Sequence, residues 1–307
     1  MKKAGTTLMT YALALGLSGH ITHPAHSQSQ PPTETDIRAA HSKATAIRDI
    51  EYAALGEHSL KLDLFLPDNA AKPPLLVYIH GGGWRSGSKD YCPMKFVLDY
   101  GYALASIEYR LSQEAIFPAQ IHDCKAALRF LKANASAYGY DAGKVAVAGQ
   151  SAGGQLAALI GSSHGVDATE GAIGNHLDQS TRVDAVIDYY GASDFILRTK
   201  TQPGRANDAG SVCYELFGGP TKDRLTLAKL ASTVTHLDPD DPPYLIFHGT
   251  SDRVVLPDQS YRLHLACLDN DVDSHLVIIE GAGHGGDRFF DPEYRDMVIE
   301  FLNRTLR

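Results

Sequence analysis

Hydrophobic residues recur along this chain in two alternating patterns, short unbroken runs and helical periods. Alternating apolar positions over 47–66 predict two strands that turn at Leu55-Gly56-Glu57. Short apolar runs then predict strands that are buried on both faces of a sheet, at 75–79, 103–107, 145–148, 183–189, 244–247 and 276–279. Helical periods lie between them, at 118–131, 152–160, 257–268 and in a last helix that ends near Leu306.

This order of elements predicts an α/β fold. Strands that alternate with helices pair in parallel through right-handed crossovers, which gives a doubly wound, mostly parallel sheet with helices on both faces. Active sites of such sheets lie at the carboxyl ends of the strands. The segment 192–241 breaks the alternation and is interrupted by glycines, so we expect an irregular, lid-like insertion near the site.

The first residues have the layout of a signal peptide. Lys2 and Lys3 precede the apolar stretch 8–17, and Ala25-His26-Ser27 places small residues at the minus-three and minus-one positions of a cleavage site. The apolar stretch is shorter than the roughly 20 residues that span a bilayer. We therefore expect a signal peptide at 1–27, a mobile leader at 28–46 and one domain at 47–307, in a secreted or periplasmic protein with no membrane contact after cleavage.

Composition narrows the possible functions. The chain has 28 basic and 36 acidic side chains, and loss of two lysines with the signal would leave 26 − 36 = −10. An acidic chain without a basic stripe disfavours nucleic-acid binding. Neither the cysteines nor the histidines show the spacing of a metal site, so we expect no metal and no cofactor. Zero, one or two disulfides remain open for Cys92, Cys124, Cys213 and Cys267.

The strongest chemical signal is a nucleophile motif. Gly149-Gln150-Ser151-Ala152-Gly153 lies between a predicted strand and a predicted helix, which is the context of a nucleophile elbow. Side chains at 149 and 153 would collide with neighbouring backbone in so tight a turn. Ser151 is therefore the expected nucleophile.

A serine nucleophile needs a base, and the base needs a carboxylate that orients it. Because this fold places them in the order Ser, Asp, His, the search begins after residue 151. We expect His284 as the base, since it follows the last strand among glycines, and Asp252 as the acid, since it follows the neighbouring strand. Asp194 is the rival acid, and His248 is expected to be a packed, hydrogen-bonding histidine.

The stretch His80-Gly81-Gly82-Gly83-Trp84 follows the third strand, where such folds hold an oxyanion loop. The expected donors to the oxyanion are the N–H groups of Gly82, Gly83, Trp84 and Ala152. We expect His80 to brace the loop, and we expect substrate contacts from Trp84, Gln150 and Val255.

Together these segments resemble the bifunctional acetylxylan and feruloyl esterase group of α/β-hydrolases, which is related to hormone-sensitive-lipase-like carboxylesterases. The resemblance covers about residues 47–306 and rests on HGGGW, EYRLS, FPAQIHDCKAALRFLKANASAYGYD, VAVAGQSAGGQLAAL, PPYLIFHGTSDRVV and EGAGHG. It implies an α/β-hydrolase fold without a large N-terminal cap, and removal of acetyl or feruloyl groups from acylated plant xylan. Arg110, in EYRLS, and Asp123, in FPAQIHD, are expected to form a structural ion pair.

Two other functions remain open. The same triad would serve a small-molecule carboxylesterase or an amidase that resembles arylformamidases. A catalytically inactive binding module of this fold is the alternative from another class, although such modules usually lose the serine or the histidine, and both stand here in intact motifs.

Overall fold

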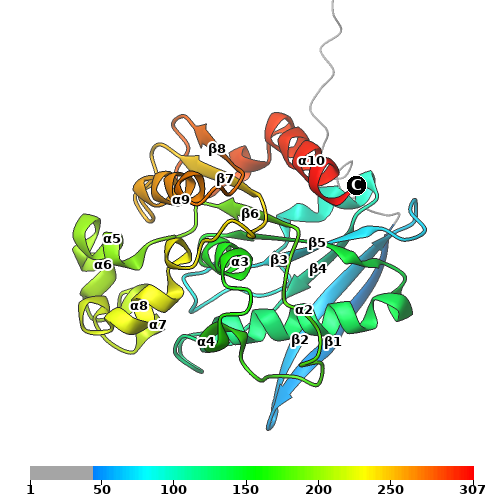
Figure 1. Cartoon of the computed structure of the whole chain (residues 1–307), viewed down its shortest axis with the longest axis horizontal. Helices are drawn as coiled ribbons and strands as arrows, with labels where there is room; N and C mark the ends of the chain where they lie inside the picture. Colours follow the sequence, from blue (N-terminus) through cyan, green and yellow to red (C-terminus); the bar gives the residue numbers. More distant parts are fainter. Residues whose placement is uncertain (1–43) are drawn as a thin grey trace, which may run out of the picture.

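A single eight-stranded sheet forms the centre of the computed structural model, which describes residues 44–307 (Figure 1). Strands β3 to β8 pair in parallel, whereas β2 runs antiparallel to both of its neighbours. The predicted doubly wound, mostly parallel sheet is therefore confirmed. The strands follow one another across the sheet in the order β1 (Ala44–Leu55), β2 (His58–Pro67), β4 (Ala103–Ile107), β3 (Pro74–Ile79), β5 (Asp141–Gln150), β6 (Ala185–Tyr189), β7 (Tyr244–Gly249), β8 (Ser274–Ile279).

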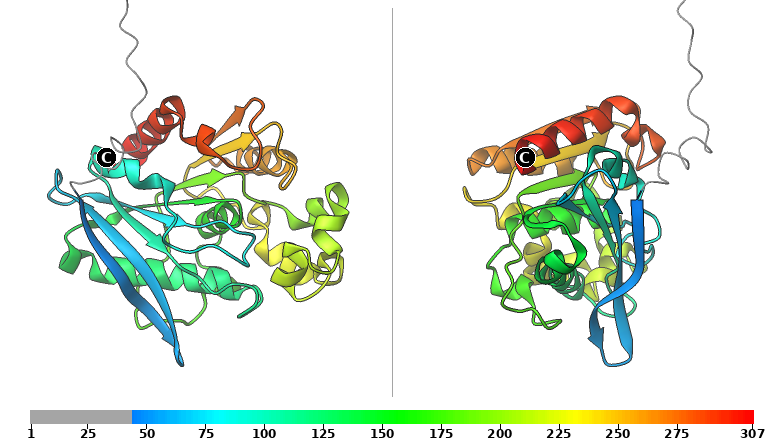
Figure 2. Two further views of the ribbon diagram at one scale, coloured as in Figure 1. Left: turned by 180° about the vertical axis from the view of Figure 1, so that it is seen from behind. Right: turned by 90° about the vertical axis from the view of Figure 1, so that its right-hand side faces the viewer.

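Helices cover both faces of this sheet and build two apolar layers (Figures 1 and 2). The larger layer is formed with α2 (Ala119–Tyr138), α3 (Ala152–Ser162) and α9 (Asp258–Asp269). The other is formed with the 3-10 helix η2 (Pro93–Tyr100) and α10 (Pro292–Leu306). Because both faces are covered, the central strands bury nearly every side chain, which explains their unbroken apolar runs.

The sheet begins three residues earlier than predicted. Ala44 already pairs with Pro67, so residues 44–46 belong to β1 and not to a leader. The apolar alternation does not reveal this, because β1 lies at the edge of the sheet and its first residues are mostly exposed. The predicted signal peptide and the leader up to residue 43 lie outside the described residues.

The segment 192–241 is helical, so the prediction of an irregular insertion is wrong. It forms α5 (Phe195–Thr201), α6 (Pro203–Asn207), α7 (Val212–Phe217), α8 (Leu225–Ala231), and the 3-10 turns η3 (Thr221–Asp223) and η4 (Thr233–Thr235). The side chains of Asp194 and Ser211 cap the first turns of α5 and α7, and Gly218 ends α7 in a left-handed conformation. These helices gather at one end of the molecule, yet Phe195 and Phe217 are fully buried in the larger apolar layer (Figure 1).

The four cysteines are all buried and free. Of the alternatives that the sequence left open, the structure thus has no disulfide between them. No helix within residues 44–307 combines the length and the apolar character needed to cross a membrane.

Candidate active site

Ser151 lies at the turn between β5 and α3, where the backbone is strained. Its φ and ψ are 54° and −113°, a region that residues other than glycine rarely adopt. A Cβ atom at Gly149 would lie 2.1 Å from the carbonyl oxygen of Gly153, and one at Gly153 would lie 2.1 Å from that of Ile79. Both glycines are therefore needed for the close approach that holds Ser151 at the end of the strand, as the sequence predicted.

The structure brings Ser151, His284 and Asp252 together in one chain of hydrogen bonds. The Ser151 Oγ lies 2.8 Å from the His284 Nε2, and the His284 Nδ1 lies 2.6 Å from the Asp252 Oδ2. Because a carboxylate only accepts, Nδ1–H donates to Asp252 and Nε2 accepts from the serine hydroxyl. This tautomer is the one in which the imidazole can take a proton from Ser151.

Asp252 follows β7 and is fully buried, which would raise the pKa of its carboxyl. Hydrogen bonds from His248, from His284 and from the Val254 N–H outweigh burial, so the pKa lies well below its usual range. The acid remains ionised beside His284. The rival Asp194 instead caps α5 and pairs with Arg262 at 3.4 Å.

His248 is a packed histidine, as expected. Its Nε2 donates to the carbonyl of Val255 at 3.0 Å, and its Nδ1 accepts from the Ser260 hydroxyl at 2.6 Å. The Nε2 also lies 3.3 Å from Asp252. His248 therefore holds the loop that carries the acid.

The loop after β3 has the backbone geometry that an oxyanion hole requires. Gly82, Gly83 and Trp84 all have positive φ, and the N–H of Ser86 closes a tight turn on the carbonyl of Gly82. A Cβ atom at Gly83 would lie 2.7 Å from Val212 of α7. Among the hydrogen bonds between described residues, none uses the N–H of Gly82, Gly83, Trp84 or Ala152. These four donors are thus available to a ligand.

His80 braces this loop, as its position predicted. Its Nδ1 donates to the carbonyl of Gly81 at 2.8 Å, and its ring stacks on Tyr109 with 4.4 Å between centroids. Burial lowers the pKa of His80, which favours the neutral imidazole. The predicted ion pair is also present, since the Arg110 Nη2 lies 2.8 Å from the Asp123 Oδ1.

A cavity of about 560 Å³ opens over Ser151 and His284. The three expected substrate contacts, Trp84, Gln150 and Val255, all line it. Trp84 is only 2% exposed, and its indole N–H donates to Gln155 at 3.0 Å, so the ring is a fixed wall.

Further side chains also line the cavity. Tyr190 lies with its ring edge-on to His284, 4.8 Å between centroids, and fixes that imidazole from the side. Arg198 and Arg205, from α5 and α6, also line the cavity. No period or motif marks these arginines, because only the fold of the short helices brings them to the site. Within residues 44–307, no group of three or more metal-binding side chains is found.

The chain is similar to a known family and to curated esterases. A family model described as BD-FAE matches residues 62–267. The esterase LipC of Mycobacterium tuberculosis is 30% identical over 72% of this chain and 55% of its own length. The chain spans about half to three fifths of the length of the first curated relatives that it matches.

Solved structures show the same α/β-hydrolase fold. A truncated carbohydrate esterase from gut microbiota superposes with a TM-score of 0.76 at 30% identity, over 90% of this chain and 99% of the other. A bifunctional GH43-CE protein of Bacteroides eggerthii superposes with a TM-score of 0.76 at 32% identity, over 85% of this chain and 38% of the other.

Proposed function

This chain belongs to the BD-FAE family, and from that premise we propose that it is a serine hydrolase of carboxylic esters. One observation carries the proposal: the hydrogen-bond chain from Asp252 through His284 ends at Ser151, which lines a cavity together with the backbone donors of the glycine loop. This is the set of groups that acyl transfer requires.

In the first step, His284 takes the proton of Ser151 as the serine oxygen attacks the ester carbonyl. The negative charge that develops on the carbonyl oxygen is stabilised by the N–H of Ala152 and by those of the loop, with Gly82 and Gly83 as first choices and Trp84 as the third. Each such donor stabilises a transition state by about 2.7–4 kcal/mol. The C–O bond of the ester then breaks, and His284 gives its proton to the departing alcohol.

In the second step, water attacks the acyl group on Ser151. His284 takes a proton from the water and returns it to Ser151 when the acyl–oxygen bond breaks. The products are the free acid and the regenerated enzyme. Asp252 remains ionised throughout, because its lowered pKa keeps the carboxylate available to stabilise the His284 cation.

The substrate that we propose is an acylated plant polysaccharide such as xylan, or its oligosaccharides, from which acetyl or feruloyl groups are removed. A solved relative at 30% identity is described as a carbohydrate esterase, and another at 32% identity as a bifunctional GH43-CE protein, which supports this class. The cavity volume of about 560 Å³ falls within the range of small-molecule binding sites. We also propose that the enzyme is exported, on the strength of residues 1–27.

The test is the Ser151→Ala variant, assayed on 4-nitrophenyl acetate, acetylated xylan and methyl ferulate beside the exposed-serine control Ser180→Ala. We expect Ser151→Ala to lower kcat by about 10⁴-fold or more, and we expect the control to match the wild type. Equal rates for Ser151→Ala and the wild type would refute the serine mechanism. Activity on 4-nitrophenyl acetate alone would retain the mechanism and assign the enzyme to small-molecule esters.

A further inference from the structure

The charged side chains that line the active-site cavity are all cationic. Arg85, Arg198 and Arg205 lie in its wall, and no acidic residue among the described ones does. The chain as a whole has 36 acidic and 28 basic side chains, so this local excess runs against its composition. Arg85 is neutralised, since its guanidinium lies 3.2 Å from Glu215. The other two arginines are not.

Arg198 is the most unusual of them, because its side chain is buried with a relative exposure of 1%. It forms no ion pair with any carboxylate of residues 44–307. Its Nη2 donates to the carbonyl of Val254 at 2.9 Å, whereas its Nε has no hydrogen-bond partner in that part of the chain. A buried guanidinium without an anion is costly, so a cation in this place calls for a ligand that completes it.

Arg205 adds a second guanidinium to the same wall. Burial raises the pKa of the Cys213 thiol, and the charges of Arg198 and Arg205 both act to lower it, so both guanidinium groups lie near this one buried residue. Arg205 is itself exposed and has no ion-pair partner among the described residues. It therefore lies at the exposed edge of this wall, whereas Arg198 is buried in it.

Two of the three acids nearest in sequence are committed elsewhere, and the third, Asp208 at the end of α6, forms no ion pair with Arg205 in the described structure. Asp194 caps α5 and pairs with Arg262, and Glu215 pairs with Arg85. Neither can neutralise Arg198 or Arg205 without giving up those contacts.

We infer that Arg198 and Arg205 form a carboxylate-binding subsite, and that the preferred ester carries a carboxylate near its scissile bond. The inference rests on the proposed esterase function and refines its substrate class. Paired guanidinium groups match a carboxylate in both charge and geometry, and hydrogen bonds between charged groups are stronger than those between neutral ones. The carboxylate has two chemical sources: the far end of a dicarboxylic acyl group, or an acidic sugar on the alcohol side.

A purely structural role would explain Arg198 only in part. Its bond to Val254 steadies the loop that begins at Asp252, and one hydrogen bond suffices for that. It gives no reason for a buried guanidinium without an ion pair, or for a second cation at Arg205. Selectivity between charged and neutral esters separates the two explanations, because a steadier loop aids both kinds of substrate alike.

The experiment measures kcat/KM for two matched pairs of esters. The acyl-side pair is 4-nitrophenyl hemisuccinate against 4-nitrophenyl butyrate. The alcohol-side pair is acetylated xylan oligosaccharides with and without a uronic acid substituent. The proteins are the wild type, Arg198→Met, Arg205→Gln and the control Arg304→Gln, whose arginine is exposed on α10 and pairs with Asp273. Arg205→Gln alters an exposed residue, so its result does not depend on whether Arg198→Met folds.

In the wild type we expect the acidic member of one pair to be favoured by about tenfold, through a higher KM for the neutral member. Arg198→Met and Arg205→Gln should each lower that ratio at least about threefold, and Arg304→Gln should leave it unchanged. The pair that shows the preference identifies the source of the carboxylate. Ratios near one in both pairs, or ratios insensitive to both arginines, would overturn the inference while esterase activity persists. Loss of activity on all four esters would refute the proposed function instead.

Discussion

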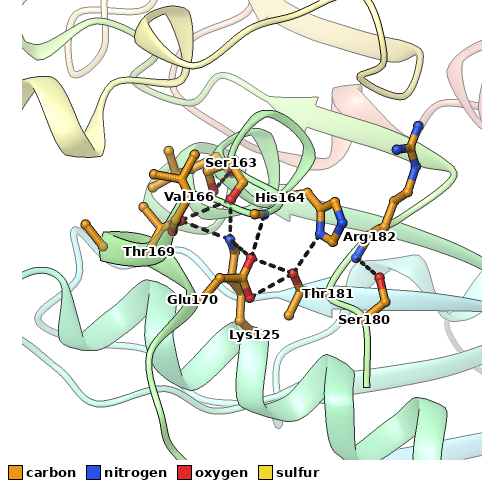
Figure 3. A network of polar contacts seen from close by, with 12 residues as sticks. Lys125, Ser163, His164, Val166, Thr169, Glu170, Ser180, Thr181 and Arg182 are labelled. Carbon is orange, nitrogen blue, oxygen red and sulfur yellow. Dashed lines mark hydrogen bonds and ion pairs between the residues drawn. The ribbon is translucent and has the colours of Figure 1, made fainter. Parts of the chain in front are cut away.

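Buried cations occur in two regions of this molecule, and the two regions treat them in opposite ways. Between α2 and the segment that follows α3, Lys125 pairs with the carboxylate of Glu170 (Figure 3). Arg129 pairs with the same carboxylate at 3.5 Å. At the active-site cavity, Arg198 and Arg205 have no carboxylate partner among the described residues. Glu170 compensates the charges of Lys125 and Arg129 within the fold, whereas in the inferred subsite a ligand would compensate those of Arg198 and Arg205.

In the region of Lys125 the ammonium group and the Glu170 carboxylate are satisfied by neighbouring polar groups. The ammonium group donates to the carbonyl of Ser163 at 2.6 Å, to Thr169 at 3.0 Å and to Glu170 at 2.9 Å. Glu170 also accepts from Thr181 at 2.8 Å. Burial acts to raise the pKa of Glu170, and Lys125 outweighs it, so the pKa is lowered and the pair is ionised. Nothing in this network faces a cavity at the active site.

The first prediction tests the paired region. Lys125→Met removes one partner of a buried ion pair and leaves Glu170 with less compensation, so we expect the free energy of unfolding to fall by about 3 kcal/mol. Urea denaturation at pH 7 measures it, with Lys222→Met as an exposed control. An unchanged midpoint for Lys125→Met would show that the network is not structural, and the contrast between the two regions would then disappear.

The second prediction concerns Asp188, a buried carboxyl group without an ion-pair partner in the described structure. Asp188 on β6 is buried, and its Oδ2 has no hydrogen-bond partner in the described part of the chain. Burial raises its pKa to about 7, although the Gly191 N–H and the nearby His248 act to lower it. The unfolded chain loses this proton near pH 4, and the folded protein loses it only near pH 7. Stability therefore falls as pH rises between those values.

We expect Asp188→Asn to reduce the loss of stability between pH 5 and pH 8 by about 2 kcal/mol. Denaturation curves at a series of pH values measure this slope. Asp241, whose pKa is also raised to about 7, is intact in the variant, so part of the slope remains. If Asp188→Asn kept the full wild-type slope, Asp188 would not be the group that titrates.

The sequence predicted most of what the sheet determines. Ser151, Asp252 and His284 each follow a strand, and parallel strands bring their carboxyl ends to one edge, so three positions far apart in sequence could be placed together. The glycines at 149 and 153 were predictable from the tight turn between the strand and the helix. Close backbone contacts leave no room for a side chain there.

The sequence did not predict what tertiary packing determines. The helices α5 to α8 are only five to seven residues long, and helices this short are stable only through packing and caps. Their periods are too brief to read, so 192–241 was predicted to be irregular. Arg198 and Arg205 lie on two of these helices, and nothing in their spacing indicates that both reach the cavity.

The third prediction applies the first substitution to the other region, and its expected effect is the smallest. Arg198→Met removes a buried guanidinium that has no anion, together with one hydrogen bond to the carbonyl of Val254. Replacing a buried charge with an apolar side chain of similar length relieves its desolvation cost, which offsets the lost bond. We expect the free energy of unfolding to remain within about 1 kcal/mol of the wild type in the absence of ligand.

The measurement is the same urea denaturation that is applied to Lys125→Met. A loss as large as that of Lys125→Met would mean that Arg198 supports the fold, and its cation would then need no ligand to explain it. Near-equal stability means that the fold gains little from this buried charge, which is expected if the charge serves the substrate.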